Sequence, residues 1–423
     1  MSEAAARRTV EAVWRIESAK LVAGLTRLVG DLGQAEDLAQ DALVVALEKW
    51  PESGVPENPG AWLMATAKHR ALDHFRRAKM LDRKHEDLTR RLEAEQPSPE
   101  AELHAALDDA IGDGLLRLIF MTCHPVLALE ARVAFTLRLL GGLTSEEIAR
   151  AFLVPVTTVQ QRIVRAKRTL KESRVPFELP PAHELGERLE AVLGVIYLIF
   201  NEGYSATAGE DWVRPALCED ALRLGRILAG LAPEEPEVHG LAALMEIQAS
   251  RLRARRGPQG EPVLLMDQDR GRWDQLLIRR GLEALERAES LRRPLGPYCL
   301  QGAIAACHAR AKAPGETDWE AIVALYDALA EIDPSPVVEL NRAVAVGMAF
   351  GPEAGLELVD ELVSEPALKS YHWLPSVRGD LLAKLGRTDE ARSELERAAF
   401  LTQNLREREL LLGRVKSLGG HGG

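Results

Sequence analysis

The side chains best suited to binding chemistry are polar and basic groups that recur between Gln160 and Lys171. From Ala151 to Lys171 there are five basic residues and no acidic one. Glutamine and arginine can form paired hydrogen bonds with base edges in the major groove of DNA, and lysine and arginine neutralise phosphates. A solvated helix of a bundle usually mixes both charge signs, so the pattern favours DNA binding over that alternative. The polar face consists of Gln160, Gln161, Arg162, Val164, Arg165, Lys167, Arg168 and Lys171.

Two short helices joined by a tight turn would position this face. Thr144 and Glu147 fit the capping box, in which each side chain accepts a hydrogen bond from the backbone amide of the other residue. Pro155 stands where a helix accepts proline, at its first position. We therefore predict a helix-turn-helix between Gly141 and Lys171. An apolar stripe at helical spacing faces away from the polar side: Val159, Ile163, Ala166 and Leu170.

A second basic helix is predicted over about 61–79, directly after a loop rich in proline and glycine at 51–60. From Lys68 to Lys84 there are seven basic residues and two aspartates, a balance of +5. A positive helix can follow the backbone of a single strand, and a neighbouring irregular loop can hold an unstacked base. A plain basic surface helix is the alternative that the residues leave open.

Asp37, Gln40 and Asp41 form a polar stripe on a helix predicted over 34–50, which follows a helix predicted over 10–30. Such a stripe could bind the basic helices of a partner protein. A solvated helix face is the alternative explanation of the same pattern.

Helix-forming residues dominate the 423 residues and alternating β-branched runs are scarce, so we predict an all-α fold. The breaks in the helical pattern predict one domain over 1–81, a linker over 82–108 and a second domain over 109–175. A helical extension is expected over 182–416.

The extension shows a repeat that resembles the tetratricopeptide (TPR) unit. Residues 376–404 carry the clearest copy, and equivalent second helices are expected near Ala321 and Ala354. The resulting spacings of 33 and 37 residues are close to the TPR period of about 34. We predict two or three degenerate repeats in a TPR-like α-solenoid, whose concave surface would suit a peptide, a regulatory protein or another domain.

The charge distribution limits where nucleic acid can bind. Residues 1–175 hold 25 basic and 25 acidic residues, so the whole net charge of −11 lies in residues 176–423. An acidic half is a poor surface for nucleic acid. The chain shows no nucleophile–base set, no Gly-rich phosphate loop and no cluster of metal-ligand residues, so we predict no enzyme activity, no metal and no cofactor. Without an apolar run of about 18–20 residues, we expect a cytoplasmic protein with no membrane partner.

Three motifs resemble the extracytoplasmic-function (ECF) group of RNA polymerase sigma factors. They are G-x-A-E-D-L-A-Q-D-A-L from Gly33, P-x-A-W-L-x-x-x-A-x-x-x-A-L-D-x-x-R-R from Pro59, and L-x-L-L-G-G-L-T-x-x-E-I-A-x-A-F from Leu137. The resemblance covers about residues 10–173. Two further segments are similar to the subgroup with long C-terminal extensions, LIFMTCHPVLALE at 118–130 and NEGYSA at 201–206.

The resemblance implies that residues 10–80 form sigma domain two and residues 110–173 form sigma domain four, which would also sit on the β flap of the polymerase. The residues implied to contact the β′ clamp helices of core RNA polymerase are Asp37, Gln40 and Asp41. Those implied to contact the minus-ten promoter element are Asn58, Trp62, Lys68, Arg70, Arg76 and Arg77. Those implied to contact the minus-thirty-five element are Thr157, Thr158, Gln160, Gln161, Val164, Arg165 and Arg168.

Asn201, Glu202 and Tyr204 are candidates for a contact with the sigma half or with polymerase, whereas a helix-ending turn with Gly203 at the cap would explain them equally well. The extension would control sigma activity in cis, by shielding the DNA-binding helices or by supporting the holoenzyme. Two rival hypotheses stay open. One is a helix-turn-helix regulator with a TPR sensor that acts on duplex operators, and the other is a TPR adaptor with a vestigial sigma region.

Overall fold

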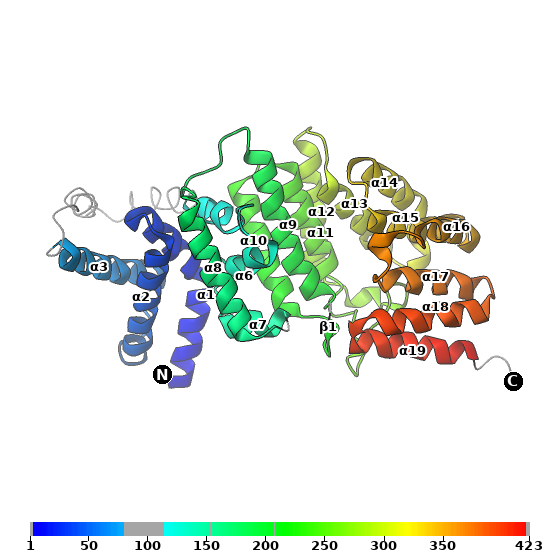
Figure 1. Ribbon diagram of the computed structural model, residues 1–423, viewed down its shortest axis with the longest axis horizontal. Helices are drawn as coiled ribbons and strands as arrows, with labels where there is room; N and C mark the ends of the chain where they lie inside the picture. The colour runs from blue at the N-terminus through cyan, green and yellow to red at the C-terminus, as the bar shows by residue number, and fades with distance from the viewer. Residues whose placement is uncertain (1–2, 80–113, 153, 207, 420–423) are drawn as a thin grey trace. The chain divides into compact units, whose positions relative to one another are not determined.

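The structure of the chain, a computed structural model, describes residues 3–79, 114–152, 154–206 and 208–419 (Figure 1). Within these residues the chain is helical apart from one two-stranded sheet, which confirms the predicted all-α class. The chain divides into two compact units, Met1–Val195 and Ile196–Gly423. The predicted linker over 82–108 lies outside the described residues.

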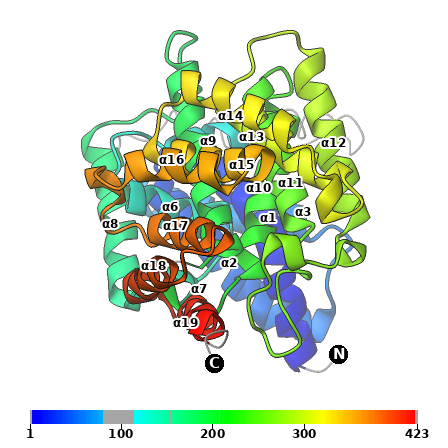
Figure 2. The same cartoon turned by 90° about the vertical axis from the view of Figure 1, so that its right-hand side faces the viewer.

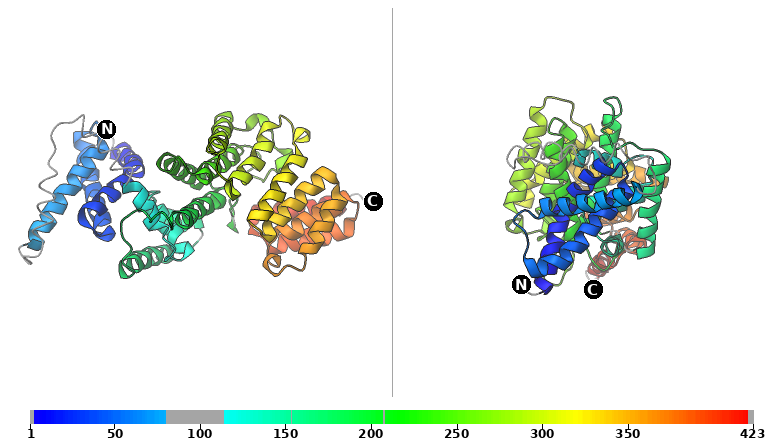
Figure 3. Two further views of the ribbon diagram at one scale, coloured as in Figure 1. Left: turned by 90° about the horizontal axis from the view of Figure 1, so that it is seen from above. Right: turned by 90° about the vertical axis from the view of Figure 1, so that its left-hand side faces the viewer.

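Unit 1 begins with three helices that pack on one another: α1 (Glu3–Val29), α2 (Leu32–Ser53) and α3 (Pro59–Lys79) (Figure 3). The Asp31 side chain caps α2 by accepting a hydrogen bond of 3.0 Å from the Gln34 amide. The chain reverses just before this cap at Gly30, whose φ of +74° is a backbone conformation that favours glycine. The core between the helices is formed by Leu25, Ala35, Ala39, Ala42, Trp50, Leu63, Ala67 and Ala71.

The loop between α2 and α3 is shorter than the composition of residues 51–60 indicates. Helix α2 runs through Pro51, and the Gly54 amide still donates to the Trp50 carbonyl at 3.0 Å. Helix α3 then begins at Pro59, where the Asn58 side chain accepts from the Ala61 amide at 3.0 Å. Only residues 54–58 are irregular, because α2 continues past Pro51 and a local cap starts α3 early.

The second part of unit 1 contains the predicted helix-turn-helix. After a helical stretch at 114–122 come α6 (Leu129–Leu139), α7 (Ser145–Phe152) and α8 (Val156–Glu172) (Figure 1). The capping box is confirmed: the Thr144 amide donates to Glu147 at 2.8 Å and the Glu147 amide donates to Thr144 at 3.1 Å. Pro155 is the N-cap of α8, one residue before the predicted position. The apolar stripe of α8 is buried, as predicted: Val159, Ile163, Ala166 and Leu170.

The boundary between the compact units falls inside α9 (Leu185–Tyr204). The first turns of α9 belong to unit 1, where Arg188 donates a hydrogen bond of 2.8 Å to the Phe120 carbonyl. Unit 1 therefore extends beyond the predicted domain end at 175 and includes the start of the predicted extension.

Unit 2 continues with helices that each pack on the next in the chain. These helices are α10 (Pro215–Leu231), α11 (Pro236–Ala249), α12 (Gln275–Ser290), α13 (Pro297–Arg310), α14 (Trp319–Ile332), α15 (Pro336–Phe350), α16 (Pro352–Leu362), α17 (Trp373–Lys384), α18 (Thr388–Leu401) and α19 (Leu405–Gly419). Short 3-10 turns lie between some of them, at Leu265–Asp267, Arg270–Arg272, Pro314–Glu316 and Pro366–Leu368.

Helices α14 to α19 stack as consecutive hairpins (Figure 2). The helices α14, α16 and α18 begin at Trp319, Pro352 and Thr388, which are 33 and 36 residues apart and close to the predicted positions. Small residues allow the close approach of neighbours. A Cβ atom on Gly355 of α16 would lie 2.8 Å from the Cα of Gly347 on α15, a distance that only glycine at this crossing avoids.

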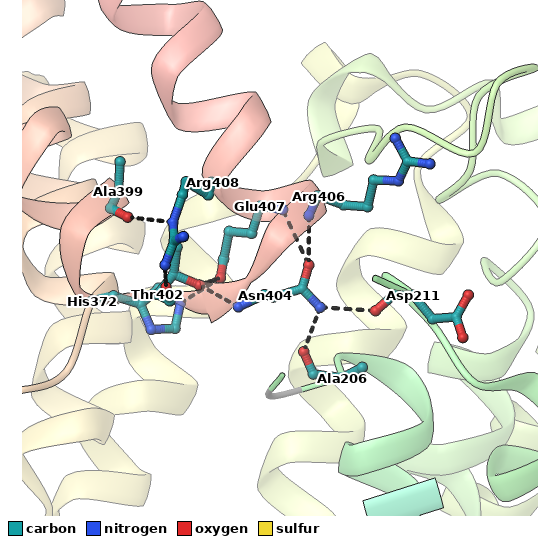
Figure 4. Close-up of polar contacts among 9 residues, drawn as sticks. All are labelled: Ala206, Asp211, His372, Ala399, Thr402, Asn404, Arg406, Glu407 and Arg408. Carbon is teal, nitrogen blue, oxygen red and sulfur yellow. Dashed lines mark hydrogen bonds and ion pairs between the residues drawn. The ribbon is translucent and has the colours of Figure 1, made fainter. Parts of the chain in front are cut away.

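The first and last parts of unit 2 are joined by a polar clasp centred on Asn404 (Figure 4). The short strands β1 (Ala208–Gly209) and β2 (Gln403–Asn404) pair in parallel. The buried Asn404 amide group donates to the Ala206 carbonyl at 3.0 Å and to the Asp211 carbonyl at 2.8 Å. Its side-chain oxygen accepts from the amides of Arg406 and Glu407 at the start of α19. One side chain thus satisfies four backbone groups.

We expect Asn404→Ala to lower the free energy of unfolding of unit 2 by about 3 kcal/mol, because it leaves buried carbonyls and amides without partners. Gln403→Ala is the matched control, since Gln403 is exposed on the same strand and its backbone pairing needs no side chain. Hydrogen exchange of the full chain at 206–211 and 403–407 measures the effect. Equal protection in the two variants would contradict the role assigned to Asn404.

Candidate nucleic-acid interface

The side chains predicted to read the minus-thirty-five element share one exposed face of α8. Val164 is 65% exposed and the Arg168 side chain is 67% exposed. The structure thus brings this set together on the side of α8 opposite its buried stripe, and Thr158 alone is half-buried. The other exposed members are Thr157, Gln160, Gln161 and Arg165.

The N-terminus of α8 has the character of a phosphate-binding helix end. Its N-cap is Pro155, which offers no side-chain acceptor to the amides of the first turn. These amides and the helix dipole favour an anion. Thr157 and Thr158 lie in this turn, beside the face that carries Arg165. The arrangement can hold a phosphate at the helix end while the following turns face base edges.

A buried carboxylate ties α8 to α2. Glu36 is only 4% exposed, and its carboxylate lies 2.6 Å from Lys167 Nζ and 3.5 Å from Arg138 Nε. A second ion pair lies nearby, at 3.1 Å between Lys171 Nζ and Asp31. The Gln34 amide, followed by Lys171, lowers the pKa of the Asp31 carboxyl. Lys167, which the sequence groups with the side chains predicted to face DNA, therefore binds α2 instead, whereas Lys171 stays 80% exposed in its pair with Asp31.

The sequence did not predict that Glu36 would be buried and would pair with two basic residues. Its position four residues before Gln40 indicated only a contact between these two side chains, because residues at this spacing lie on the same side of a helix. Its cationic partners, however, come from helices about a hundred or more residues later in the chain. No local pattern pairs residues at such a separation.

The predicted polymerase-binding residues differ in their surroundings. Asp37 and Asp41 are exposed on α2, whereas Gln40 is half-buried and donates a hydrogen bond of 3.0 Å to Glu36. Asp41 forms an ion pair of 3.1 Å with Arg70 of α3, and both side chains are about half exposed. The structure therefore joins a residue predicted to contact polymerase with one predicted to contact DNA.

The residues predicted to contact the minus-ten element are spread along α3, from the Asn58 cap to Arg77 near its end. Asn58 is exposed and caps the helix, and Trp62 packs edge-on against Trp50 with ring centroids 5.4 Å apart. Lys68 is half-buried and Arg70 is exposed. The side chains of Arg76 and Arg77 lie outside the described part of the structure.

The NEGYSA segment forms the end of α9 and contacts its own unit. Glu202 binds Arg214, and the Tyr204 ring stacks on Phe200 at 5.7 Å between centroids. Asn201 is half-buried. The alternative of a glycine cap is wrong, because Gly203 lies inside α9. A Cβ there would lie 2.7 Å from the Cys218 amide nitrogen, so glycine is required by the close packing of α9 on α10.

Across the described residues no group of three or more His, Cys, Asp or Glu side chains is arranged to hold a metal ion. None of the described helices is both long and apolar enough to cross a membrane.

Comparison with known families finds sigma-70 region 2 at residues 17–80 and sigma-70 region 4 at residues 117–170. Residues 188–289 match a family of unknown function, DUF6596. The helices that carry the two basic surfaces therefore lie inside the two sigma matches, and the matched family of unknown function begins in α9.

One relative matches most of the chain, and two sigma factors match less than half of it. The uncharacterized protein R00370 of Rhizobium meliloti is 44% identical over 90% of this chain and 89% of its own length. The probable ECF RNA polymerase sigma factor SigI of Mycobacterium tuberculosis is 30% identical over 175 residues, which are 41% of this chain and 58% of that protein. The probable RNA polymerase sigma-C factor of Mycobacterium bovis is 29% identical over 42% of this chain and 85% of its own length.

We expect Glu36→Gln to weaken the packing of α8 on α2 by about 2–4 kcal/mol, because it leaves Lys167 and Arg138 without their counter-charge. Glu172→Gln is the matched control. It breaks the pair with Arg168 at 3.7 Å, in which both side chains are about two-thirds exposed, and should cost at most about 0.5 kcal/mol. Hydrogen exchange across α2 and α8 in the full chain compares them. Unchanged protection in Glu36→Gln would show that the buried pair does not hold α8.

Proposed function

Because the chain belongs to the ECF group of sigma factors, which act in transcription initiation, we propose that it binds core RNA polymerase through α2 and selects promoters through α3 and α8. Its sigma regions imply core polymerase and promoter DNA as partners. The observation that carries the finer proposal is the exposed polar face of α8, which stays open to solvent while the helix packs on α6 and α7 and Lys167 binds Glu36 of α2. The polymerase forms the bonds, and this chain contributes binding contacts.

The proposed polymerase contact is made by exposed carboxylates of α2. Asp37 and Asp41 would meet basic residues of the β′ clamp helices, with Gln40 at the edge of the contact. The existing pair between Asp41 and Arg70 does not oppose this, since exposed ion pairs contribute only about 0–1 kcal/mol. If a basic residue of polymerase replaced Arg70 as the partner of Asp41, the Arg70 side chain would be free to contact the DNA strand.

The proposed minus-ten contact is made by the start of α3 and its preceding loop. Asn58 and Trp62 would border a captured base, because they lie where the irregular residues 54–58 meet the helix. Basic side chains further along α3 would follow the phosphates of the opened strand. These side chains are Lys68, Arg70, Arg76 and Arg77.

The proposed minus-thirty-five contact is made by the exposed face of α8 in the major groove, while the same domain rests on the β flap. Arg165 and Arg168 extend from the middle of the helix, where base edges and phosphates are both within reach of an arginine side chain. The full set is Thr157, Thr158, Gln160, Gln161, Val164, Arg165 and Arg168.

We further propose that the extension, residues 182–416, controls this activity in cis. Its excess of acidic residues supports an electrostatic influence on the DNA-binding surfaces. Asn201, Glu202 and Tyr204 are proposed to contribute through the end of α9. The stacked hairpins α14–α19 offer a surface for a regulatory protein or peptide.

The polymerase contact predicts that Asp37→Lys/Asp41→Lys lowers runoff transcription from the chain's own upstream DNA at least tenfold, because like charges would face each other across the contact. The matched control is Glu353→Lys/Glu357→Lys, which makes the same charge change at the same spacing on the exposed face of α16. This control should stay within twofold of the wild type. Full transcription by the α2 variant would favour a regulator that acts on duplex operators without polymerase.

Control in cis predicts that truncation after Arg174 changes runoff transcription at least fivefold. An increase means that the extension shields the DNA-binding helices, and a loss means that it supports the holoenzyme. Because the truncation also removes the hydrogen bond from Arg188 to Phe120, the full-length variant Arg188→Met is its control. Transcription equal to that of this control would reject both forms of control.

A further inference from the structure

Unit 2 contains a continuous group of arginine and aromatic side chains, here called the arginine–aromatic cluster: Tyr204, Trp212, Arg251, Arg255, Arg270 and Trp273. The Arg255 guanidinium lies 3.9 Å from the centre of the Tyr204 ring and 5.1 Å from that of Trp212. The Arg251 guanidinium lies 5.8 Å from Tyr204 and 5.7 Å from Trp273. The Arg270 guanidinium completes the cluster and lies 4.9 Å from the centre of the Trp273 ring.

Two of these arginines lack a counter-charge within the described structure. Arg251 is only 7% exposed, and no carboxylate in the described ranges pairs with it or with Arg255. The Nε atoms of both side chains are buried without an acceptor. Arg270 is better satisfied, since it donates to the His308 and Ala311 carbonyls and to Thr317.

Other arginines of unit 2 form ion pairs with nearby carboxylates. Arg226 pairs with the buried Glu246 at 2.6 Å, and Arg378 binds both Asp360 and Glu394. Glu246 lies five residues before Arg251, yet its carboxylate is used by Arg226. Burial of an unpaired charge costs several kcal/mol, and a cation–π contact returns about 2 kcal/mol or less. Arg251 therefore needs a further partner, and the half-buried Arg255 lies beside it in the cluster.

The rest of the cluster adds donors and no negative charge. The indole N–H groups of Trp212 and Trp273 are also buried without an acceptor. His308 is held neutral beside the cluster, since burial, followed by Arg251 and Arg270, lowers its pKa to about 4. The surroundings of Arg251 thus present hydrogen-bond donors and a positive potential, the combination that binds an oxyanion.

A surface pocket shares the Trp273 side chain with this cluster. The pocket has a volume of about 680 Å³, and Trp273 contributes to its wall together with Arg253, Arg256, Arg272 and Asp274. Its three arginines form a local positive surface on an otherwise acidic half of the chain. Such a surface attracts anions from solution toward the cluster.

We propose that the arginine–aromatic cluster binds a small oxyanion, a carboxylate or a phosphate, which supplies the counter-charge to Arg251 and Arg255. The planar guanidinium groups can each donate two hydrogen bonds to such an anion. The inference goes beyond the sigma activity and does not depend on it, since the cluster lies wholly within unit 2. It makes the extension a domain that responds to an anionic small molecule.

The test compares the wild-type full chain with Arg251→Met/Arg255→Met. Methionine keeps much of the volume and removes the charge, so this variant should unfold at the same temperature as the wild type or higher when no oxyanion is present. Addition of about 10 mM inorganic phosphate or citrate, with ionic strength held constant by chloride, should raise the wild-type Tm by about 3 °C or more. The variant should lose at least four-fifths of this shift.

Arg279→Met/Arg280→Met is the matched control, because it removes two exposed arginines of α12 and should respond as the wild type does. Arg251→Lys/Arg255→Lys keeps the charge without the paired donors and should respond more weakly. A response to phosphate alone or to citrate alone supports the proposal and assigns the anion class.

Three results would overturn the proposal. One is a wild-type Tm that neither anion shifts, and another is an equal shift in Arg251→Met/Arg255→Met, which would place the anion elsewhere. The third is an Arg251→Met/Arg255→Met variant that is unfolded without anion while Arg251→Lys/Arg255→Lys gives the full wild-type response. That result would assign the two arginines to the structure of unit 2 alone.

Discussion

The buried carboxylate of Glu36 needs counter-charge, and its ion pairs link α8, the helix proposed to contact DNA, to α2. Its cations come from α6 and α8, through Arg138 and Lys167. Helix α8 packs on α6 and α7, and Lys167, which lies beside its apolar stripe, adds the ion pair to Glu36 of α2. The face with Arg165 and Arg168 is then left exposed. The ion pairs of Glu36 therefore hold α8 on one side and leave its opposite face exposed for binding.

Arginine plays three physical roles in this chain, and each follows from its surroundings. At the surface, Arg70 pairs with Asp41 in a contact weak enough to exchange for polymerase and DNA. Between helices of unit 2, Arg226 is paired with a buried carboxylate and holds neighbouring elements together. In the arginine–aromatic cluster, Arg251 is buried without such a carboxylate, which makes the site selective for a ligand that brings negative charge. The net negative charge of the extension thus does not predict the positive electrostatic potential at the arginine–aromatic cluster.

Local signals in the sequence predicted the helical elements well. The Thr144–Glu147 capping box, the buried stripe of α8 and the repeated starts of α14, α16 and α18 depend on residues close together in the chain. The unpredicted features depend on distant residues: the Glu36–Lys167 pair, the Asn404 clasp and the cluster around Arg251 join segments that only the folded chain brings together. The requirement for glycine at position 203 was not predicted for the same reason, since it comes from contact with α10.

We propose that this chain opens promoter DNA only as part of RNA polymerase. Permanganate reactivity of thymines in the DNA upstream of its own coding region tests this most directly, because permanganate modifies unstacked thymines. The account predicts a reactive stretch at the minus-ten position when the full chain and purified core polymerase are both present, and none with either alone. Protection of the duplex by the chain alone, with no reactive thymines after addition of core polymerase, would contradict it.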